Sequence, residues 1–195
     1  MNAALETPPV SPSLTRRRRT FFAPLWLLAW AGILVLVAAV VYWNSATTTT
    51  VVVIRHAEKQ IGTIDDAPLS PPGEQRATRL AQMFGDSESF GRVKQIYVSD
   101  TRRAQQTAAG LAQRLGLKPV VLEGKASASE VARRVLHENR GGLAIVIGHS
   151  NTVPQIVKQL SDARDVPAIG DEEFDTMYVV TVPTIGKASV LRLKY

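Results

Sequence analysis

The chain has 195 residues, of which 45% are hydrophobic and 21% are charged, and its formal net charge is +6. This composition is typical of a globular protein and excludes an intrinsically disordered one. Because the chain contains no cysteine, a disulfide framework, a cysteine-ligated zinc site and a thiol nucleophile are also excluded. Four of the positive charges are Arg16 to Arg19. No basic stripe interleaved with aromatic residues follows them, so we expect no nucleic-acid partner.

The first predicted element is a membrane-spanning helix. Residues 1–20 are rich in Pro, Ser and Thr, which predicts a short disordered tail, whereas residues 21–43 are apolar and carry no charge. A helix that rises ~1.5 Å per residue over this length spans the ~30 Å hydrocarbon core of a bilayer. Aromatic residues lie at both ends of the run, as interfacial anchors do. A buried core helix is a poorer explanation, because the run is apolar on all sides.

The charges around this helix predict its direction. Arg16 to Arg19 precede the helix, and the first basic residue after it is Arg55. The positive-inside rule therefore predicts a single-pass protein with a cytoplasmic N-terminus and an extracytoplasmic domain, periplasmic in a Gram-negative cell. A cleaved signal peptide would have a shorter apolar region and a small-residue cleavage site, which residues 44–46 match poorly. We favour an uncleaved signal-anchor, a linker over residues 44–49 and a catalytic domain over residues 50–195.

Strand and helix patterns alternate through the remaining chain. Short apolar or β-branched runs predict strands, and apolar residues that recur every three or four positions predict helices. Strands are expected over residues 50–54, 93–99, 118–122, 143–147, 177–182 and 188–193, and helices over residues 74–84, 101–115, 129–138 and 152–160. This alternation predicts an α/β fold, a three-layer α/β/α sandwich with a mostly parallel central sheet, preceded by one transmembrane helix.

Candidate catalytic side chains follow three of the expected strands. Arg55 and His56 follow the first, Arg102 follows the second, and His149 follows the fourth. Since open α/β sheets bind ligands at the carboxyl ends of their strands, we expect these side chains to converge. Arginine presents a charged planar fork to phosphate oxygens, and a neutral imidazole can attack phosphorus to form a covalent intermediate. The pattern predicts a phosphoryl-transfer site in which cationic side chains supply much of the catalysis without a metal.

Four segments around these residues carry a further signature. Residues 55–59 are RHAEK, residues 69–77 are LSPPGEQRA, residues 99–108 are SDTRRAQQTA, and residues 148–150 are GHS. In this order they resemble the histidine phosphatase superfamily, the phosphoglycerate mutase-like proteins. The first segment is similar to the Arg-His-Gly signature of that family, with Ala57 in place of the glycine. The likeness runs from about residue 50 to residue 195.

This resemblance implies a role for each matched side chain. His56 is the nucleophile that becomes phosphorylated. Arg55, Arg102 and His149 bind the phosphate and stabilise its developing charge. In these roles His149 is expected to be protonated, whereas His56 must be neutral in order to attack. No metal and no cofactor are expected.

The resemblance leaves the general acid open. The histidine-acid branch has an aspartate after the second histidine, where this chain has Ser150. In the mutase branch the acid lies between the second arginine and the second histidine, where Glu123 and Glu130 are candidates, and Glu58 is a third. General-acid help is worth ~10²–10⁴-fold, so an enzyme without it would be restricted to good leaving groups, such as phosphohistidine and phosphoanhydrides.

Other polar residues are expected to have structural roles. His137 lies near the end of a predicted helix, where an imidazole can bond the last carbonyl groups. Arg103 is expected to be a solvated helix residue, with assistance at the pocket rim as the alternative. The acidic run 171–173 is expected to be a solvated loop, because no metal-ligand spacing accompanies it.

The leading hypothesis is a metal-independent hydrolase that cleaves phosphomonoesters through a phosphohistidine on the extracytoplasmic side. Its partners would be the membrane and a phosphorylated small molecule or envelope component. One alternative is a phosphohistidine phosphatase, which the predicted topology disfavours because histidine kinases signal in the cytoplasm. The other is a catalytically weak, membrane-tethered phosphate-binding module. Mutase activity is disfavoured, because the chain is too short for insertions that close over a sugar phosphate.

Overall fold

A computed structural model describes the protein over residues 25–62, 66–85, 92–124, 126–163 and 165–195. The chain divides into two compact units, residues 1–39 and residues 40–195. The predicted tail and the first four residues of the predicted membrane span lie outside the described residues.

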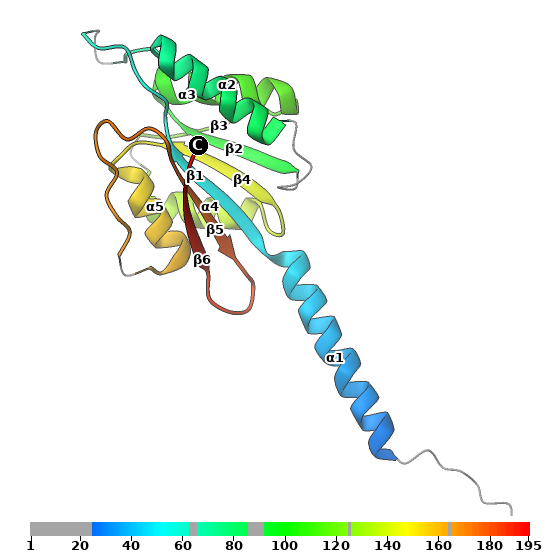
Figure 1. The fold of residues 1–195 in the computed structure, drawn as a ribbon. Helices are drawn as coiled ribbons and strands as arrows, with labels where there is room; N and C mark the ends of the chain where they lie inside the picture. Colours follow the sequence, from blue (N-terminus) through cyan, green and yellow to red (C-terminus); the bar gives the residue numbers. More distant parts are fainter. Residues whose placement is uncertain (1–24, 63–65, 86–91, 125, 164) are drawn as a thin grey trace, which may run out of the picture. The chain divides into compact units, whose positions relative to one another are not determined.

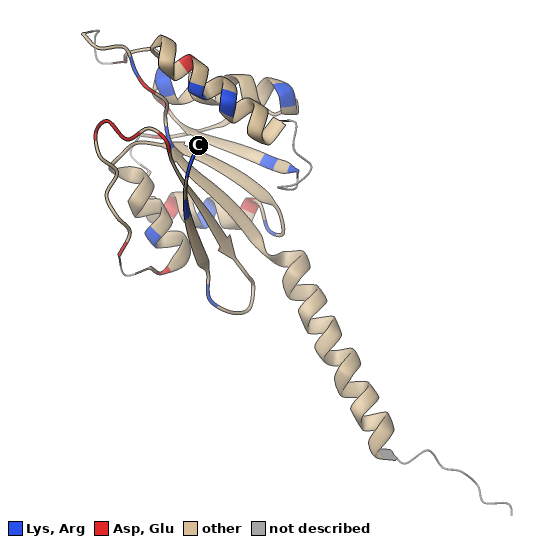
Figure 2. Cartoon of the chain, in the orientation of Figure 1, with Lys and Arg blue, Asp and Glu red and all other residues tan. Residues whose placement is uncertain are grey.

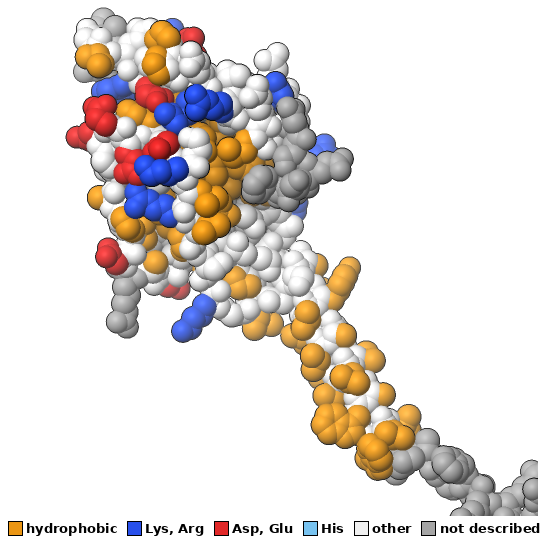
Figure 3. Space-filling model, viewed as in Figure 1, with side chains coloured by type: hydrophobic (Ala, Val, Ile, Leu, Met, Phe, Trp, Pro, Cys, Tyr) orange, Lys and Arg blue, Asp and Glu red, His pale blue; other side chains and the backbone are white. Residues whose placement is uncertain are grey.

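The first unit contains most of helix α1 (Leu25–Thr47). The described part of α1 carries no charged residue, and its apolar side chains are exposed (Figures 2 and 3). The segment Trp26–Thr47 has a mean hydropathy of 2.2, none of it is buried, and it is long and apolar enough to cross a membrane. A signal sequence passes the same test of length and composition. The helix is therefore consistent with the predicted anchor, and the side of the membrane on which the domain lies remains a prediction.

Helix α1 extends further than the sequence predicted. The linker expected over residues 44–49 is helical as far as Thr47, and Thr48 alone separates α1 from the first strand. The hydroxyl of Thr47 donates to the Trp43 carbonyl, and the hydroxyl of Thr48 donates to the Asn44 carbonyl. The Asn44 carbonyl is among the last four of the helix, which a helix end otherwise leaves without partners. The polar residues after Trp43 thus complete the helix.

The second unit is built around a six-stranded sheet with the order β3-β2-β4-β1-β5-β6. The strands are β1 (Thr49–Arg55), β2 (Val93–Ser99), β3 (Val120–Leu122), β4 (Leu143–Gly148), β5 (Thr176–Val182) and β6 (Ser189–Lys194). The first four are parallel to one another, and β5 and β6 are antiparallel to their neighbours. The prediction of a mostly parallel sheet is confirmed.

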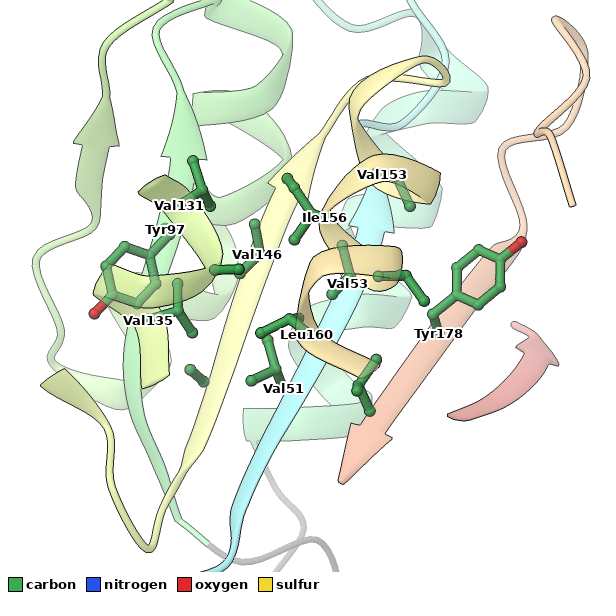
Figure 4. Packing of buried hydrophobic residues seen from close by; sticks show 14 of the residues in the cluster. Val51, Val53, Tyr97, Val131, Val135, Val146, Val153, Ile156, Leu160 and Tyr178 are labelled. Carbon is green, nitrogen blue, oxygen red and sulfur yellow. The ribbon is translucent and has the colours of Figure 1, made fainter. Parts of the chain in front are cut away.

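Helices cover both faces of the parallel strands (Figure 1). They are α2 (Pro71–Gly85) and α3 (Arg102–Leu115) on one face, and α4 (Ala128–Glu138) and α5 (Thr152–Ser161) on the other. Successive residues of β1 explain this arrangement, because Val51 and Val53 enter the α4–α5 core (Figure 4) whereas Val52 and Ile54 enter the α2–α3 core. A strand that is apolar on both faces requires a layer on each side. The three-layer sandwich is confirmed.

The topology brings the ends of β1 and β4 together. These central strands pair in parallel with Arg55 opposite Gly148, and the His56 amide donates to the Gly148 carbonyl at 2.9 Å. The residues that follow the two strands, His56 and His149, therefore emerge side by side at the carboxyl edge of the sheet.

Candidate active site

His56 is held in one tautomer at the end of β1. The neighbouring Ala57 amide donates to Thr107 Oγ1 at 3.0 Å, which fixes the strand end against α3. His56 Nδ1 lies 2.7 Å from the Ala57 carbonyl oxygen. Because a carbonyl can only accept, Nδ1 carries the ring proton and Nε2 presents its lone pair. That lone pair accepts a hydrogen bond from Arg103 Nε at 3.1 Å.

The surroundings of His56 favour the neutral imidazole. The side chain is 4% exposed, and this burial is the main reason that its pKa is lowered to about 4. The hydrogen bond to Ala57 opposes the shift, whereas the charges of Arg103, His149 and Arg55 add to it. His56 is therefore neutral at pH 7, which is the state that nucleophilic attack requires.

His149 lies directly beside His56. The two ring centroids are 5.2 Å apart, and the rings meet edge to face at 68°. The His149 amide donates to Thr152 Oγ1 at 2.9 Å, which ties the residue to the first turn of α5. Burial, followed by the charge of Arg103, lowers the pKa of His149, and Asp100 partly offsets this. The free site thus does not favour the protonated His149 that was expected, although a nearby dianion favours the cationic form.

The second arginine of the site is Arg103 and not Arg102. A cleft of about 430 Å³ is lined by Arg55, His56, Lys59, Arg103, His149, Ser150, Asn151 and Asp171. Arg102 is exposed and lines a different groove with Lys118, and its backbone amide donates to Asp66 Oδ1 at 2.7 Å. Consecutive helical residues project about 100° apart, so only one of two adjacent arginines can face the histidines. The sequence prediction that brought Arg102 to this site requires this correction.

A sequence signal for Arg103 was present in the buried stripe of α3. Ala104, Thr107, Ala108 and Leu111 form that stripe, and Arg103 lies four residues before Thr107. Residues four apart share a helix face, so Arg103 is the arginine that lies nearer the sheet. The interpretation of Arg103 as a solvated residue is wrong, and the alternative of a residue at the pocket is confirmed.

Arg55 connects the site to the loop before β5. Its Nη1 donates to the carbonyl groups of Gly170 and Asp171, both at 2.8 Å, and of Glu173 at 3.2 Å. Its guanidinium lies 3.9 Å above the ring of Phe174. Its Nε is buried and has no hydrogen-bond partner among the described residues. Burial lowers the pKa of Arg55, which arginine's high intrinsic value tolerates without loss of charge. One arginine thus fixes the loop and contributes positive charge to the cleft.

The three candidates for the general acid have different surroundings. Arg76 donates three hydrogen bonds of 2.6 to 3.0 Å to the Glu58 carboxylate, and these lower the pKa of Glu58 even though its burial acts to raise it. The Glu130 carboxylate caps helix α4 through Ser127, and those bonds lower its pKa. Glu123 is exposed and lines a cavity of about 130 Å³ together with His149. Of the three, only Glu123 shares a cavity with a site histidine.

Of the remaining residues, the acidic run 171–173 is a loop as expected, but Asp171 lines the cleft, so this loop is also part of the site. His137 is in the last turn of α4. Figure 2 shows the acidic run 171–173 in the loop before β5. In this run the Glu173 carboxylate accepts a hydrogen bond from the Arg192 guanidinium at 2.7 Å. Within the described ranges, no group of three or more His, Asp or Glu side chains could hold a metal ion.

Comparisons with known proteins give one family match. Residues 51–126 match the family model of the histidine phosphatase superfamily, branch 1. No curated protein matches the chain.

Solved structures with the same fold include three phosphatases. The protein histidine phosphatase SixA, in complex with tungstate, is 17% identical with a TM-score of 0.60, and the match covers 74% of this chain and 96% of that one. A mycobacterial glucosyl-3-phosphoglycerate phosphatase is 18% identical with a TM-score of 0.52, and the match covers 69% of this chain and 90% of that one. A phosphoserine phosphatase from Entamoeba histolytica is 16% identical with a TM-score of 0.51, and the match covers 72% of this chain and 99% of that one. At these identities the likeness concerns the fold alone.

Proposed function

We propose that this chain, through its histidine phosphatase superfamily domain, hydrolyses phosphomonoesters by way of a phosphohistidine at His56. The observation that carries the proposal is the state of that imidazole. It is neutral, it is protonated on Nδ1, and its Nε2 lone pair lies among Arg103, His149 and Arg55. A neutral nucleophile beside two arginine side chains is suited to attack on an anionic phosphoryl group.

The first step transfers the phosphoryl group to the protein. The phosphate enters the 430 Å³ cleft, and Arg103 donates to a phosphate oxygen in place of His56 Nε2. The freed lone pair forms the N–P bond as the P–O bond of the leaving group breaks. The bound dianion raises the pKa of His149, so that this imidazole donates a hydrogen bond to it. The leaving oxygen takes a proton, which we assign to the carboxyl group of Glu123.

The second step releases the phosphate. Water attacks the phosphohistidine, the N–P bond breaks, and His56 regains its lone pair while Glu123 takes a proton from the water. Cationic side chains neutralise the phosphoryl charge that metal ions neutralise in many phosphoryl-transfer enzymes. We therefore propose that the reaction is metal-independent, which activity retained after treatment with EDTA would support.

We also propose that α1 is an uncleaved anchor with the catalytic domain on the extracytoplasmic side. The apolar helix and the position of Arg16 to Arg19 before it support this topology. Protease added to intact cells or spheroplasts would digest the domain if it lies outside the cytoplasm. Protection of the domain until the membrane is permeabilised would overturn the assignment.

One observation favours a second class of substrate. Glu123 is exposed, so water competes with it for contact with the leaving oxygen. Substrates whose leaving groups need little protonation, such as phosphohistidine and phosphoanhydrides, would then be preferred. The relative rates on phosphohistidine and on alkyl phosphates decide between the two classes.

The test compares full-length wild type with two histidine variants in detergent, using an aryl phosphate at pH 4–8. His56→Ala should lose at least ~10³-fold in turnover, because both chemical steps pass through Nε2. His137→Gln is the matched control, since His137 lies outside the site, and should retain activity. If the folded wild type binds phosphate without turnover, the chain is a phosphate-binding module instead.

A further inference from the structure

The end of α1 is bound to two turns of the domain. Residues 40–195 form one compact unit, which includes the last turns of the helix. The Ile185 amide donates to Asn44 Oδ1 at 2.9 Å, and the Thr184 hydroxyl lies 2.7 Å from that of Thr47. On the other side, a Cβ at Gly141 would approach the Ala46 carbonyl oxygen to 2.3 Å, so this turn packs closely against the helix. The helix end therefore has a fixed place at the domain.

These contacts fix the depth at which the turn between β5 and β6, residues 183–188, lies relative to a membrane that α1 crosses. Asn44 directly follows Tyr42 and Trp43, which are 76% and 64% exposed. Amphipathic aromatic rings at the end of a membrane span lie at the headgroup level. Because Ile185 is hydrogen-bonded to Asn44, the turn lies close to that level too.

The composition of the turn suits a lipid interface. Ile185 is 60% exposed, and transfer of an exposed apolar side chain from water into the lipid interface lowers the free energy. Lys187 is also exposed, and its ammonium group can reach lipid phosphates while its stem lies along the apolar region.

The turn and the active site lie on opposite edges of the sheet. Thr49 of β1 pairs with Val182 of β5, so the start of β1 and the turn after β5 share one edge. His56 and His149 follow the other ends of their strands. The seven residues of β1 separate the two edges by ~20 Å, at ~3.3 Å per residue. The headgroup region of one leaflet is only ~5–7 Å thick.

We propose that the β5–β6 turn is a second membrane contact, which holds one edge of the sheet against the bilayer and turns the active site away from it. This inference rests on the proposed phosphatase activity and on α1 as the anchor. Its consequence concerns the substrate class. Phosphate esters that are free in water reach the site, whereas lipid phosphates in the anchoring membrane do not.

The orientation can be tested without any activity measurement. Since the chain has no cysteine, Ile185→Cys and Ile61→Cys each give a single labelling site. Ile61 is a matched control, because it is an isoleucine that is 98% exposed in the loop after β1, at the active-site edge. The full chain, labelled with a polarity-sensitive fluorophore, would be placed in vesicles that contain headgroup spin-labelled lipid. A label at 185 should be quenched strongly and a label at 61 should not.

Two results would overturn the orientation. One is equal quenching at 185 and 61, and the other is no quenching at 185 together with none at 187, a second position in the turn. A label on Lys187→Cys guards against a local disturbance at 185, since it lies in the same turn and should be quenched as well. If neither turn position is quenched, the turn does not contact lipid.

The substrate class is tested in vesicles that contain phosphatidic acid, with an aryl phosphate in solution. Wild type should hydrolyse the aryl phosphate and leave the phosphatidic acid intact. Hydrolysis of phosphatidic acid at a comparable rate would overturn the inference. Failure on both substrates would contradict the proposed phosphatase, and the quenching result would then still decide the orientation by itself.

Discussion

Arg103 Nε donates a hydrogen bond to His56 Nε2 over 3.1 Å. The nitrogen that would attack phosphorus is therefore occupied by an arginine in the free site. An incoming phosphate offers that arginine a charged acceptor, and charge-assisted hydrogen bonds are stronger than neutral ones. Binding of the substrate and release of the nucleophilic lone pair are thus one event.

This relationship predicts different effects for two adjacent arginines. Arg103→Ala should lower kcat/KM by ~10²–10³-fold, which is the usual effect of removing one donor at a developing negative charge. Arg102→Ala should change it by no more than about twofold, because Arg102 lies in another groove. Steady-state kinetics on an aryl phosphate measures both values. The reverse ranking would return the phosphate-binding role to Arg102.

Burial of His56 should make the domain sensitive to acid. The folded-state pKa of about 4 lies below the usual 6.5, so between these values the unfolded chain binds a proton that the folded chain does not. The contribution of His56 to the free energy of unfolding is complete above pH 6.5 and falls as the pH drops towards 4, by roughly 3–4 kcal/mol in total. Urea unfolding at pH 7.5 and 4.5 measures this loss. His56→Asn should lose less over the same interval, and an equal loss in both proteins would assign the effect to other groups.

The identity of the general acid predicts a dependence on the leaving group. Glu123→Gln should lower kcat/KM for phenyl phosphate by ~10²-fold, because this constant reports the first step, in which a poor leaving group needs the proton. The kcat/KM for 4-nitrophenyl phosphate should fall far less. Glu130→Ala is the control, since its carboxylate caps α4, and it should alter stability without this dependence. Equal losses on both substrates in Glu123→Gln would argue against an acid role.

The ion pair of Glu58 and Arg76 should contribute to stability more than to chemistry. Their side chains are about four-fifths buried and meet at 2.6 Å. Arg76→Met should lower the free energy of unfolding by roughly 1–3 kcal/mol, because it leaves the Glu58 carboxylate without its partner. Adding Glu58→Gln should recover part of that loss in a double-mutant cycle. Purely additive losses would show that the pair is not coupled.

Much of the fold could be predicted because its patterns are local. The run at residues 143–147 predicted a strand buried on both faces, and β4 spans Leu143–Gly148 with every residue buried. The order of strands and helices then predicted that His56 and His149 would meet at one edge. A helix boundary was harder to predict, since residues 44–47 are mostly polar but extend α1, and the hydroxyl groups of Thr47 and Thr48 bond to its last turn.

The site itself was predictable only in part. Arg102 and Arg103 are chemically identical, and the buried stripe of α3 distinguishes them only when the helix phase is considered. The contacts of Arg55 could not be predicted, because its partners are backbone carbonyl groups more than 100 residues away. Every residue has such a carbonyl, so the sequence contains no signal for this contact.

A chemical trap on His56 tests the central claim most directly. Full-length protein would be mixed with ³²P-labelled substrate, quenched in denaturant within one turnover and mapped by peptide. Wild type should carry phosphate that is labile in acid and stable in alkali, on the peptide that contains His56, and His56→Ala should carry none. Turnover by wild type without trapped phosphate, or equal labelling of His56→Ala, would contradict a phosphohistidine mechanism at this residue.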